Sequence, residues 1–213
     1  MKEPLSLKGG STTDLISSMK KRRMAEEIPD HQFMSAIAQE DEGALRLLIE
    51  RHQKAVYGTI LKMIGDATEA EDLAQRVFIR VFQSAPRYRP EAQFNTWLMT
   101  IVRNLVLNEY RRRQRKPWES LFHSDDEEPR EFSDATQRTA SEHLQANELK
   151  SAIESALREL PEKQRSAIIL SRYHEMPYEE IAKTLKISLS STKSLIFRAR
   201  ETLKVSLAKY MQP

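Results

Sequence analysis

The sequence predicts an all-α fold in which two small helical domains are joined by a flexible acidic linker. Only five of the 213 residues are glycine, which argues against glycine-rich phosphate loops and against β-meanders with many tight turns. Apolar residues recur at helical spacing on both sides of a polar central stretch. Cysteine is absent, so disulfides and thiolate chemistry are excluded. The net charge of +3 is small against 34 basic and 31 acidic residues, which makes the distribution of charge the main guide to function.

Residues 1–29 form a basic amino-terminal extension that we expect to be disordered. They combine Gly9 and Gly10 with serine, threonine and a basic run at 20–23. A solvated tail without a dedicated partner is the simpler interpretation, and affinity for phosphates is the alternative. No apolar run approaches the roughly 20 residues that cross a bilayer, and the start lacks the apolar core of a secretory signal. We therefore expect a cytoplasmic protein that does not insert into a membrane.

The first predicted domain, residues 30–116, begins with at least two helices. Their apolar positions recur at helical spacing: Phe33, Ile37, Leu45, Leu48, Ile49, Val56, Ile60, Leu61 and Ile64. A further helix follows Gly65, with Asp66 or Thr68 as its cap and acidic residues in its first turn, and Pro86 ends it. The apolar face expected for this helix comprises Leu73, Val77, Phe78, Val81 and Phe82.

A polar loop, residues 87–93, leads to the last helix of this domain, for which Asn95 or Thr96 is the expected cap. Leu98, Ile101, Val102 and Leu105 should face inward. The helix ends in a basic cluster, because between residues 103 and 116 six bases against Glu109 give +5: Arg103, Arg111, Arg112, Arg113, Arg115 and Lys116. Phosphate binding explains this density better than packing does, and a solvated helix face is the alternative.

Aromatic rings lie among the cations of the loop and of the helix start that follows it. Arg87, Tyr88 and Arg89 are followed by Phe94 and Trp97, which combines charges for phosphates with rings on which unpaired bases stack. Single-stranded DNA is therefore a candidate ligand. For the last two rings a place in the core is the simpler interpretation, because they share helical spacing with inward-facing residues.

Residues 117–142 are predicted to be a linker. They contain Pro117 and Pro129 and little apolar periodicity. Eight acids against two bases, Arg130 and Arg138, give a net charge of −6; the acids are Glu119, Asp125, Asp126, Glu127, Glu128, Glu131, Asp134 and Glu142.

The second predicted domain, residues 143–213, starts with two helices, the second opening at Pro161. Their apolar positions are Leu144, Leu149, Ile153, Leu157, Leu160, Ile168, Ile169, Leu170 and Tyr173. A short helix from Pro177 follows, with Tyr178, Ile181, Ala182 and Leu185 on its buried side. After a turn at 186–188, Ser188 caps the final helix, in which Leu195, Ile196, Ala199 and Leu203 pack inward. This order is that of a helix-turn-helix.

The opposite face of the final helix is suited to duplex DNA. Its small hydroxyl side chains permit close entry into a major groove, and its cations reach phosphates: Ser190, Ser191, Thr192, Lys193, Arg198 and Arg200. Over residues 189–209, five bases against Glu201 give +4. A basic helical hairpin that binds protein or nothing is the alternative.

In this order and spacing the segments resemble bacterial sigma factors of the extracytoplasmic-function type (group 4 of the sigma-70 family) over residues 30–210. The matching stretches are AEDLAQRVFIRVFQ, FNTWLMTIVRNLVLNEYRRRQR and LPEKQRSAIILSRYHEMPYEEIAKTLKISLSSTKSLIFRAR. The resemblance implies an alternative sigma factor that binds core RNA polymerase and directs promoter-specific initiation in response to an envelope or other stress signal. It also implies an anti-sigma factor as partner, often held in the inner membrane.

The resemblance also implies three binding surfaces. Glu71, Asp72, Gln75 and Arg76 would dock on the clamp of the largest polymerase subunit, and the flap of the second-largest subunit is a further partner. The minus-ten element, duplex and melted, would be contacted by Arg87, Tyr88, Arg89, Asn104, Arg111, Arg112, Arg113, Arg115 and Lys116. The minus-thirty-five element would be contacted by Ser190, Ser191, Thr192, Lys193, Arg198 and Arg200. We expect the acidic linker to occupy a basic channel of the polymerase, its carboxylates mimicking phosphates.

Four residues depart from the family pattern. Arg76 stands where relatives often carry Glu, which alters the expected polymerase contact in detail. Lys186 replaces the usual turn Gly, so it must adopt a left-handed conformation or a modified turn. Thr192 and Leu195 replace the usual Val and Arg, so the base preference of relatives does not transfer to this chain.

Two other functions compete with this interpretation. An enzyme is disfavoured because the five histidines are scattered without metal-binding spacing, and acids such as Glu69 in a first helical turn are explained by the helix dipole. We therefore expect no catalytic residues, no metal and no cofactor. A stand-alone helix-turn-helix regulator of duplex DNA is the second alternative, but it leaves the arginine cluster of the first domain unexplained.

Overall fold

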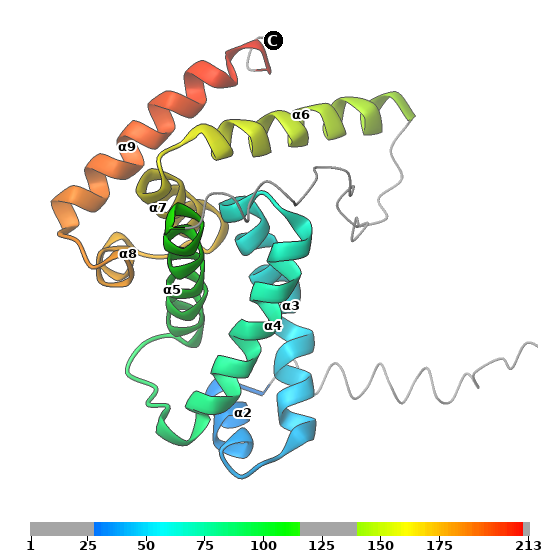
Figure 1. Cartoon of the computed structure of the whole chain (residues 1–213), viewed down its shortest axis with the longest axis vertical. Coiled ribbons are helices and arrows are strands. Elements are labelled where there is room, and N and C mark those ends of the chain that lie inside the picture. Colours follow the sequence, from blue (N-terminus) through cyan, green and yellow to red (C-terminus); the bar gives the residue numbers. More distant parts are fainter. Residues whose placement is uncertain (1–27, 116–139, 211–213) are drawn as a thin grey trace, which may run out of the picture.

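The computed structural model describes residues 28–115 and 140–210, and every regular element in these ranges is helical, which confirms the all-α prediction (Figure 1). Most of the amino-terminal extension, nearly all of the acidic linker and Lys116 lie outside the described residues. The elements are α2 (Asp30–Ile37), α3 (Glu42–Ile64), α4 (Ala67–Ser84), the 3-10 turn η1 (Ala85–Arg87), α5 (Phe94–Arg115), α6 (Ala140–Glu159), α7 (Glu162–Tyr173), α8 (Tyr178–Leu185), α9 (Leu189–Ser206) and η3 (Ala208–Tyr210).

Helices α2 to α5 form the first domain. Helix α3 packs against α2, α4 and α5, and the side chains at these contacts are almost completely buried: Leu48, Ile60, Leu73, Val77, Leu98 and Val102. Where α2 meets α3, Asp30 accepts from Arg51 at 2.6 Å and lies 3.0 Å from the His52 ring nitrogen. Burial opposes ionisation of Asp30, but His52 and Arg51 outweigh it and lower the pKa of this carboxyl.

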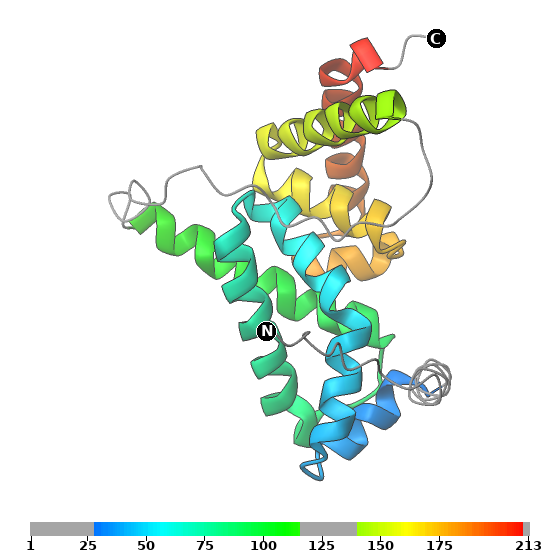
Figure 2. The same cartoon turned by 90° about the vertical axis from the view of Figure 1, so that its right-hand side faces the viewer.

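A two-residue turn joins α3 to α4. Gly65 ends α3 in the left-handed conformation with φ 82°, and its N–H donates to the carbonyl of Leu61. Asp66 then caps α4 by accepting from the Glu69 N–H at 2.8 Å, so the cap is Asp66 and not Thr68. Because the turn is so short, α3 and α4 lie side by side as an antiparallel pair (Figures 1 and 2).

Helix α5 begins earlier than its sequence predicts. Its first residue is Phe94, so the expectation that Asn95 or Thr96 caps it is wrong, and both lie within the first turn. The side chain of Thr96 instead hydrogen-bonds to Glu180 of the second domain, and that contact is invisible to a local sequence pattern.

Helices α6 to α9 form the second domain, which occupies the opposite end of the molecule from α2 (Figures 1 and 2). Its most deeply buried large side chains are Leu160, Ile169, Leu170, Ile181 and Ile196. Helix α6 starts at Ala140, three residues before the predicted start of this domain at 143.

The turn of the helix-turn-helix has the geometry expected from its sequence. Lys186 ends α8 in the left-handed region, with φ 54° and ψ 49°. Ser188 caps α9 by accepting from the Ser191 N–H at 3.1 Å. Both expectations are confirmed, and α8 and α9 pack against each other and against α7.

The strained turn makes a specific prediction about stability. Replacing Lys186 with Gly removes the left-handed penalty of an L residue, so we expect Lys186→Gly to raise the free energy of unfolding by about 1 kcal/mol. The matched control is Lys183→Gly, which places glycine in the right-handed last turn of α8 and should lower stability by about 1 kcal/mol. Urea unfolding followed by circular dichroism measures both, and equal losses in the two variants would contradict the strain.

Candidate polymerase- and nucleic-acid-binding surfaces

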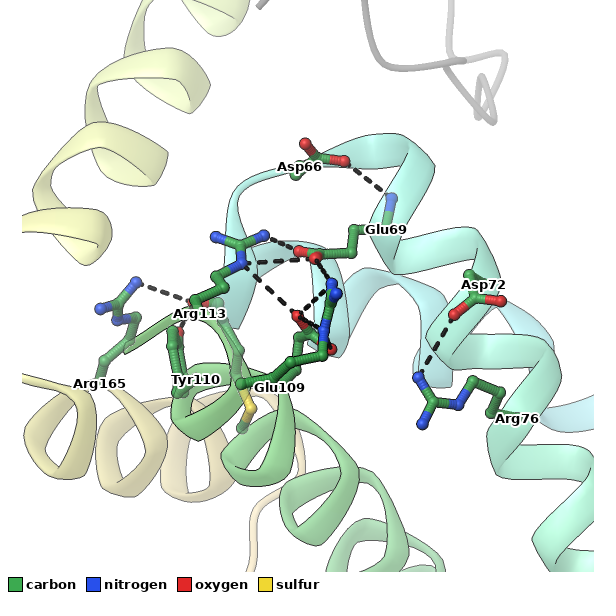
Figure 3. Close-up of polar contacts among 10 residues, drawn as sticks. Asp66, Glu69, Asp72, Arg76, Glu109, Tyr110, Arg113 and Arg165 are labelled. Carbon is green, nitrogen blue, oxygen red and sulfur yellow. Dashed lines mark hydrogen bonds and ion pairs between the residues drawn. The ribbon is translucent and has the colours of Figure 1, made fainter. Parts of the chain in front are cut away.

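The exposed face of α4 carries the first set of predicted site residues. Glu71, Asp72, Gln75 and Arg76 all lie on the outer side of the helix, while Leu73, Val77 and Phe78 on the other face are buried. The Asp72 carboxylate and the Arg76 guanidinium lie 3.5 Å apart, one helical turn from each other (Figure 3). Arg76, which stands where relatives often carry Glu, thus lies beside an acid on this surface.

Two apolar side chains extend this face. Ile79 is 54% exposed and Phe82 is 45% exposed, although the sequence pattern assigned Phe82 to the buried side, which is wrong. At 100° per residue both project from the same side of the helix as Gln75 and Arg76. A helical wheel identifies Ile79 as an apolar residue opposite the buried face, so this signal was available in the sequence. Exposed apolar groups next to charges are typical of a protein-binding surface.

The aromatic residues of the first domain form one cluster. The Tyr88 ring centroid lies 4.9 Å from that of Trp97 and 6.1 Å from that of Phe94, with the ring planes steeply inclined. Phe94 is buried, which confirms its place in the core, and Trp97 packs beside it with centroids 5.5 Å apart. Burial and the Asp30 carboxylate raise the pKa of the Tyr88 hydroxyl, which therefore stays neutral. The cluster fixes the loop that presents Arg87 and Arg89, both exposed.

The arginines at the end of α5 have two different roles. Arg112 Nε donates to both carboxylate oxygens of Glu109 at 2.9 Å, and Arg113 forms an ion pair with Glu69 of α4 (Figure 3). Glu109 is 4% exposed and pairs with both arginines within α5, while Glu69 joins the same arginines to α4. Arg111 and Arg115 are exposed and line a shallow depression with Arg112 and Asn108.

Part of the predicted phosphate-binding charge is therefore engaged in packing. The predicted charge of +5 over residues 103–116 did not include Glu69, because this acid lies on α4. Asn104 is exposed and accepts from its neighbour Arg103 at 3.2 Å, while Arg103 itself is 7% exposed and directed into the molecule. Arg111 and Arg115 are exposed, as is Arg112, whose guanidinium is paired with Glu109.

Helix α9 presents most of the residues predicted to contact duplex DNA. Ser190, Ser191, Lys193, Arg198 and Arg200 are exposed. Thr192 is not on this face: it is fully buried and its hydroxyl donates to the Ser188 carbonyl at 3.1 Å. The physical reason is that its position falls on the side of α9 that packs against the domain core, between the directions of Ser188 and Ile196.

Phe197 is a residue of this face that the sequence pattern did not single out. It is 65% exposed and lines a shallow depression with Lys193, Ser194 and Arg198. An exposed ring on a helix that enters a major groove is suited to apolar contact with thymine methyl groups. On a helical wheel Phe197 falls between Ser190 and Lys193, so the sequence alone could have placed it on this face.

Among residues 28–115 and 140–210, no group of three or more His, Cys, Asp or Glu side chains could hold a metal ion. His52 is engaged by Asp30 and His174 by Thr59, at 3.0 and 2.6 Å. None of the helices in the described part is long and apolar enough to cross a membrane.

The packing role of Glu109 can be tested by substitution. Glu109→Gln removes the charge that two arginines share, and we expect the free energy of unfolding to fall by about 2 kcal/mol, a value reduced by the partial exposure of Arg112. Asp72→Asn removes an acid from an exposed pair one turn apart and should change stability by less than about 0.5 kcal/mol. Thermal and urea unfolding measure both; equal effects would show that the buried pairs of Glu109 stabilise the fold no more than an exposed pair does.

Comparisons with known proteins agree with this geometry. The family model described as Sigma-70 region 2 matches residues 48–116, and that described as Sigma-70, region 4 matches residues 150–203. The chain is 30% identical over 180 residues to RNA polymerase sigma-H factor of Pseudomonas aeruginosa, which covers 84% of this chain and 93% of the relative. It is 36% identical over 163 residues to ECF RNA polymerase sigma factor SigE of Mycolicibacterium smegmatis, covering 76% of this chain and 61% of the relative.

Solved structures share the fold. The sigma factor RpoE of Bartonella quintana, solved with the anti-sigma factor NepR, superposes with a TM-score of 0.61 at 22% identity, over 75% of this chain and 94% of that one. CnrH, solved with the cytosolic domain of CnrY, gives a TM-score of 0.59 at 22% identity, over 84% and 97%. The family matches and the sequence identity together establish that this chain belongs to the sigma-70 family as an extracytoplasmic-function sigma factor, a transcription initiation factor.

Proposed function

We propose that this sigma factor binds core polymerase through the α4 face and contacts promoter DNA through two separate surfaces. The observation that carries the proposal is that one chain exposes a mixed acidic and apolar stripe on α4, a basic aromatic loop with cations on α5, and a basic helix-turn-helix. A polymerase, a melted strand and a duplex are the three partners that fit these three surfaces.

The α5 surface is suited to the minus-ten element. Tyr88, held by its aromatic neighbours, offers a ring for an unstacked base, and the flanking arginines offer charge for phosphates. Flipping a base costs a few kcal/mol, which stacking and phosphate contacts offset. Arg111 and Arg115 extend the phosphate track along the end of α5.

The α9 surface is suited to the minus-thirty-five element. Its first turn carries Ser190 and Ser191, whose small side chains let the helix backbone approach the floor of the groove. Lys193, Arg198 and Arg200 are positioned along the same helix for phosphates or base edges.

Binding of both domains to one polymerase explains how two small DNA-binding domains select promoter sequences. Each domain contacts few bases alone, but once the first is bound the second contact becomes intramolecular, with an effective concentration on the order of millimolar. The chain supplies positioning and charge, and the polymerase supplies the chemistry. A stand-alone duplex regulator is not favoured, because it leaves the exposed α4 stripe and the Tyr88 loop without a partner.

We further propose that an anti-sigma factor controls this protein and responds to a stress signal. The support is that RpoE of Bartonella quintana, which has the same fold, is bound to the anti-sigma factor NepR in its solved structure. CnrH, also of this fold, is bound to the cytosolic domain of CnrY. Charged and apolar groups on α4 and α9 are the surfaces that such a partner would cover.

The α4 face yields a sharp test. Ile79→Glu places a charge at the centre of the proposed polymerase contact and should weaken binding to the isolated clamp of the largest subunit by about tenfold or more. The control is Val205→Glu, an equally drastic change at a side chain that is 77% exposed near the end of α9. Fluorescence anisotropy measures both affinities, and an unchanged affinity in the Ile79 variant would remove this helix from the contact.

Reconstituted transcription tests the function as a whole. The purified chain added to core polymerase should produce transcripts with defined starts, and replacing Arg111 and Arg115 with Ala should lower promoter opening while leaving core binding intact. Arg46→Ala, at an exposed cation of α3, is the matched control. Potassium permanganate footprinting detects the melted strand. A chain that binds duplex DNA but never directs defined starts from core would instead be a stand-alone regulator.

A further inference from the structure

We propose that Asp30 and His52 are positioning residues for the minus-ten contact, and that they act on the DNA through the aromatic cluster of Tyr88, Phe94 and Trp97. The inference rests on the proposed function, because it concerns how the Tyr88 ring is presented to a melted strand. It follows from a continuous series of contacts that starts at the first residue of α2, crosses α3 and ends at the loop between α4 and α5.

The loop that carries Tyr88 begins against α2. The 3-10 turn η1 packs on α2 as well as on α4, so the blue helix and the start of the loop lie side by side (Figures 1 and 2). Residues 88–93 form neither helix nor strand, so no regular backbone hydrogen-bonding pattern fixes them. The orientation of Tyr88 therefore depends on its contacts with the rings of Phe94 and Trp97.

His52 of α3 packs against the buried member of this cluster. Its ring centroid lies 5.1 Å from that of Phe94, with the planes inclined by 47°. Phe94 is 8% exposed and contacts both Tyr88 and Trp97. Because protein interiors are closely packed, a displacement of the His52 ring shifts Phe94 and, with it, the other two rings.

Asp30 fixes the orientation of the His52 ring. Burial opposes ionisation of this carboxyl, but His52 and Arg51 together lower its pKa, so it is ionised at neutral pH. An ionised carboxylate only accepts hydrogen bonds, so His52 Nε2, at 3.0 Å, carries a proton and donates it. The ring is thus held by a hydrogen bond at one nitrogen and by packing against Phe94.

Arg51 in turn fixes the carboxylate. Its Nη1 donates to the same Asp30 oxygen at 2.6 Å and to the Ile28 carbonyl at 2.8 Å. Its guanidinium carbon lies 4.8 Å from the centroid of the Phe33 ring. With this anchor in place, the Asp30 oxygen that accepts from His52 has a defined position.

Asp30 also affects the cluster electrostatically. Burial and then the Asp30 carboxylate raise the pKa of the Tyr88 hydroxyl, so this carboxylate and this hydroxyl interact across the start of the loop. A neutral phenol stacks on a base without repelling the neighbouring phosphates.

Attachment of α2 to α3 does not by itself account for these contacts. Helix α2 is already held by the almost completely buried side chains of Phe33, Met34 and Ile37. His52, by contrast, contacts a ring of α5, the helix to which the loop leads. The polar pair therefore connects the α2–α3 junction to the base-binding loop.

A double-mutant cycle tests this connection in holoenzyme assembled from the full chain and core polymerase. His52→Ala should slow promoter opening about fivefold, and Tyr88→Ala about tenfold, as expected for loss of a base-stacking contact. Because His52 acts through Tyr88, the double variant should open the promoter no more slowly than Tyr88→Ala alone. Permanganate reactivity of melted thymines measures opening. Losses that multiply in the double variant would show that His52 acts independently of this ring and would overturn the proposal.

A conservative variant tests the role of the carboxylate. Asp30→Ala removes the acceptor and should slow opening to the same extent as His52→Ala. Asp30→Asn keeps an oxygen that can accept from His52, and should recover most of the wild-type rate. An Asn variant as slow as the Ala variant would mean that orientation of His52 by a hydrogen bond is not the cause.

The fluorescence of Trp97 reports on the cluster without polymerase or DNA. The chain has two tryptophans, so Trp118→Phe leaves Trp97 as the only one. In this background, His52→Ala should shift the emission to longer wavelength, because looser packing admits water to the indole ring. Unchanged emission would overturn the proposal.

A stability control separates positioning from general weakening of the fold. Ile37→Val removes a methyl group from a side chain that is 2% exposed at the other end of α2. We expect it to lower the melting temperature and to leave both Trp97 emission and promoter opening unchanged. If it slows opening as much as His52→Ala does, the effect is one of stability and the proposal is wrong.

These measurements also distinguish failure of the inference from failure of the proposed function. If the wild-type chain directs defined starts but the cycle is additive, the positioning role is wrong and the sigma function stands. If His52→Ala shifts Trp97 emission while the wild-type chain never directs defined starts from core, the packing of the cluster stands, and the DNA contact that it would serve is overturned.

Discussion

Helices from both domains meet at the carboxyl end of α3, and their packing is organised around it. The Met63 carbonyl is one of the acceptors that a helix end leaves without a helical partner, and it receives donors from Tyr110 of α5 and Arg165 of α7. Two residues later, the left-handed Gly65 turns the chain, and a Cβ there would approach Arg158 Cδ of α6 to 2.7 Å. Asp66 then caps α4. The helix-end carbonyl that accepts donors from two other helices, and the absence of a side chain at Gly65, set how closely these helices approach.

Charge is a second feature that shapes the molecule. The small net charge of +3 is a cancellation among segments of opposite sign, and the structure shows that some of the cancellation is local. Glu69 and Glu109 neutralise Arg112 and Arg113 at the junction of α4 and α5, and the same helix presents Arg111 and Arg115 outward. One arginine run therefore stabilises the fold and supplies charge for a nucleic acid. Net charge alone distinguishes these roles poorly, because an ion pair across two helices depends on their packing.

Apolar and polar contacts together hold the two domains against each other. The buried hydrophobic cluster includes residues of both domains. Hydroxyl, carboxylate and guanidinium groups add polar contacts, such as that between Thr96 and Glu180 and that between Arg165 and the Met63 carbonyl. The α4 stripe with Ile79 and Phe82 is exposed in this packing, so it is accessible to a protein partner.

Features with a local cause could be read from the amino-acid order alone. Helical periodicity predicted the all-α fold and most of the buried positions, and cap chemistry identified Ser188, because such features depend on neighbours within one turn. The same local reasoning left two alternatives for the cap of α4, Asp66 or Thr68, and two for Lys186, a left-handed backbone or a modified turn. Ordered motifs then identified the family.

Other features became apparent only once the helices were packed together. Glu69 of α4 holds Arg113 of α5, and Thr96 of α5 meets Glu180 of α8. The last of these contacts joins residues 84 positions apart. Such outcomes depend on how whole helices lie against one another, and no pattern within a single helix contains that information.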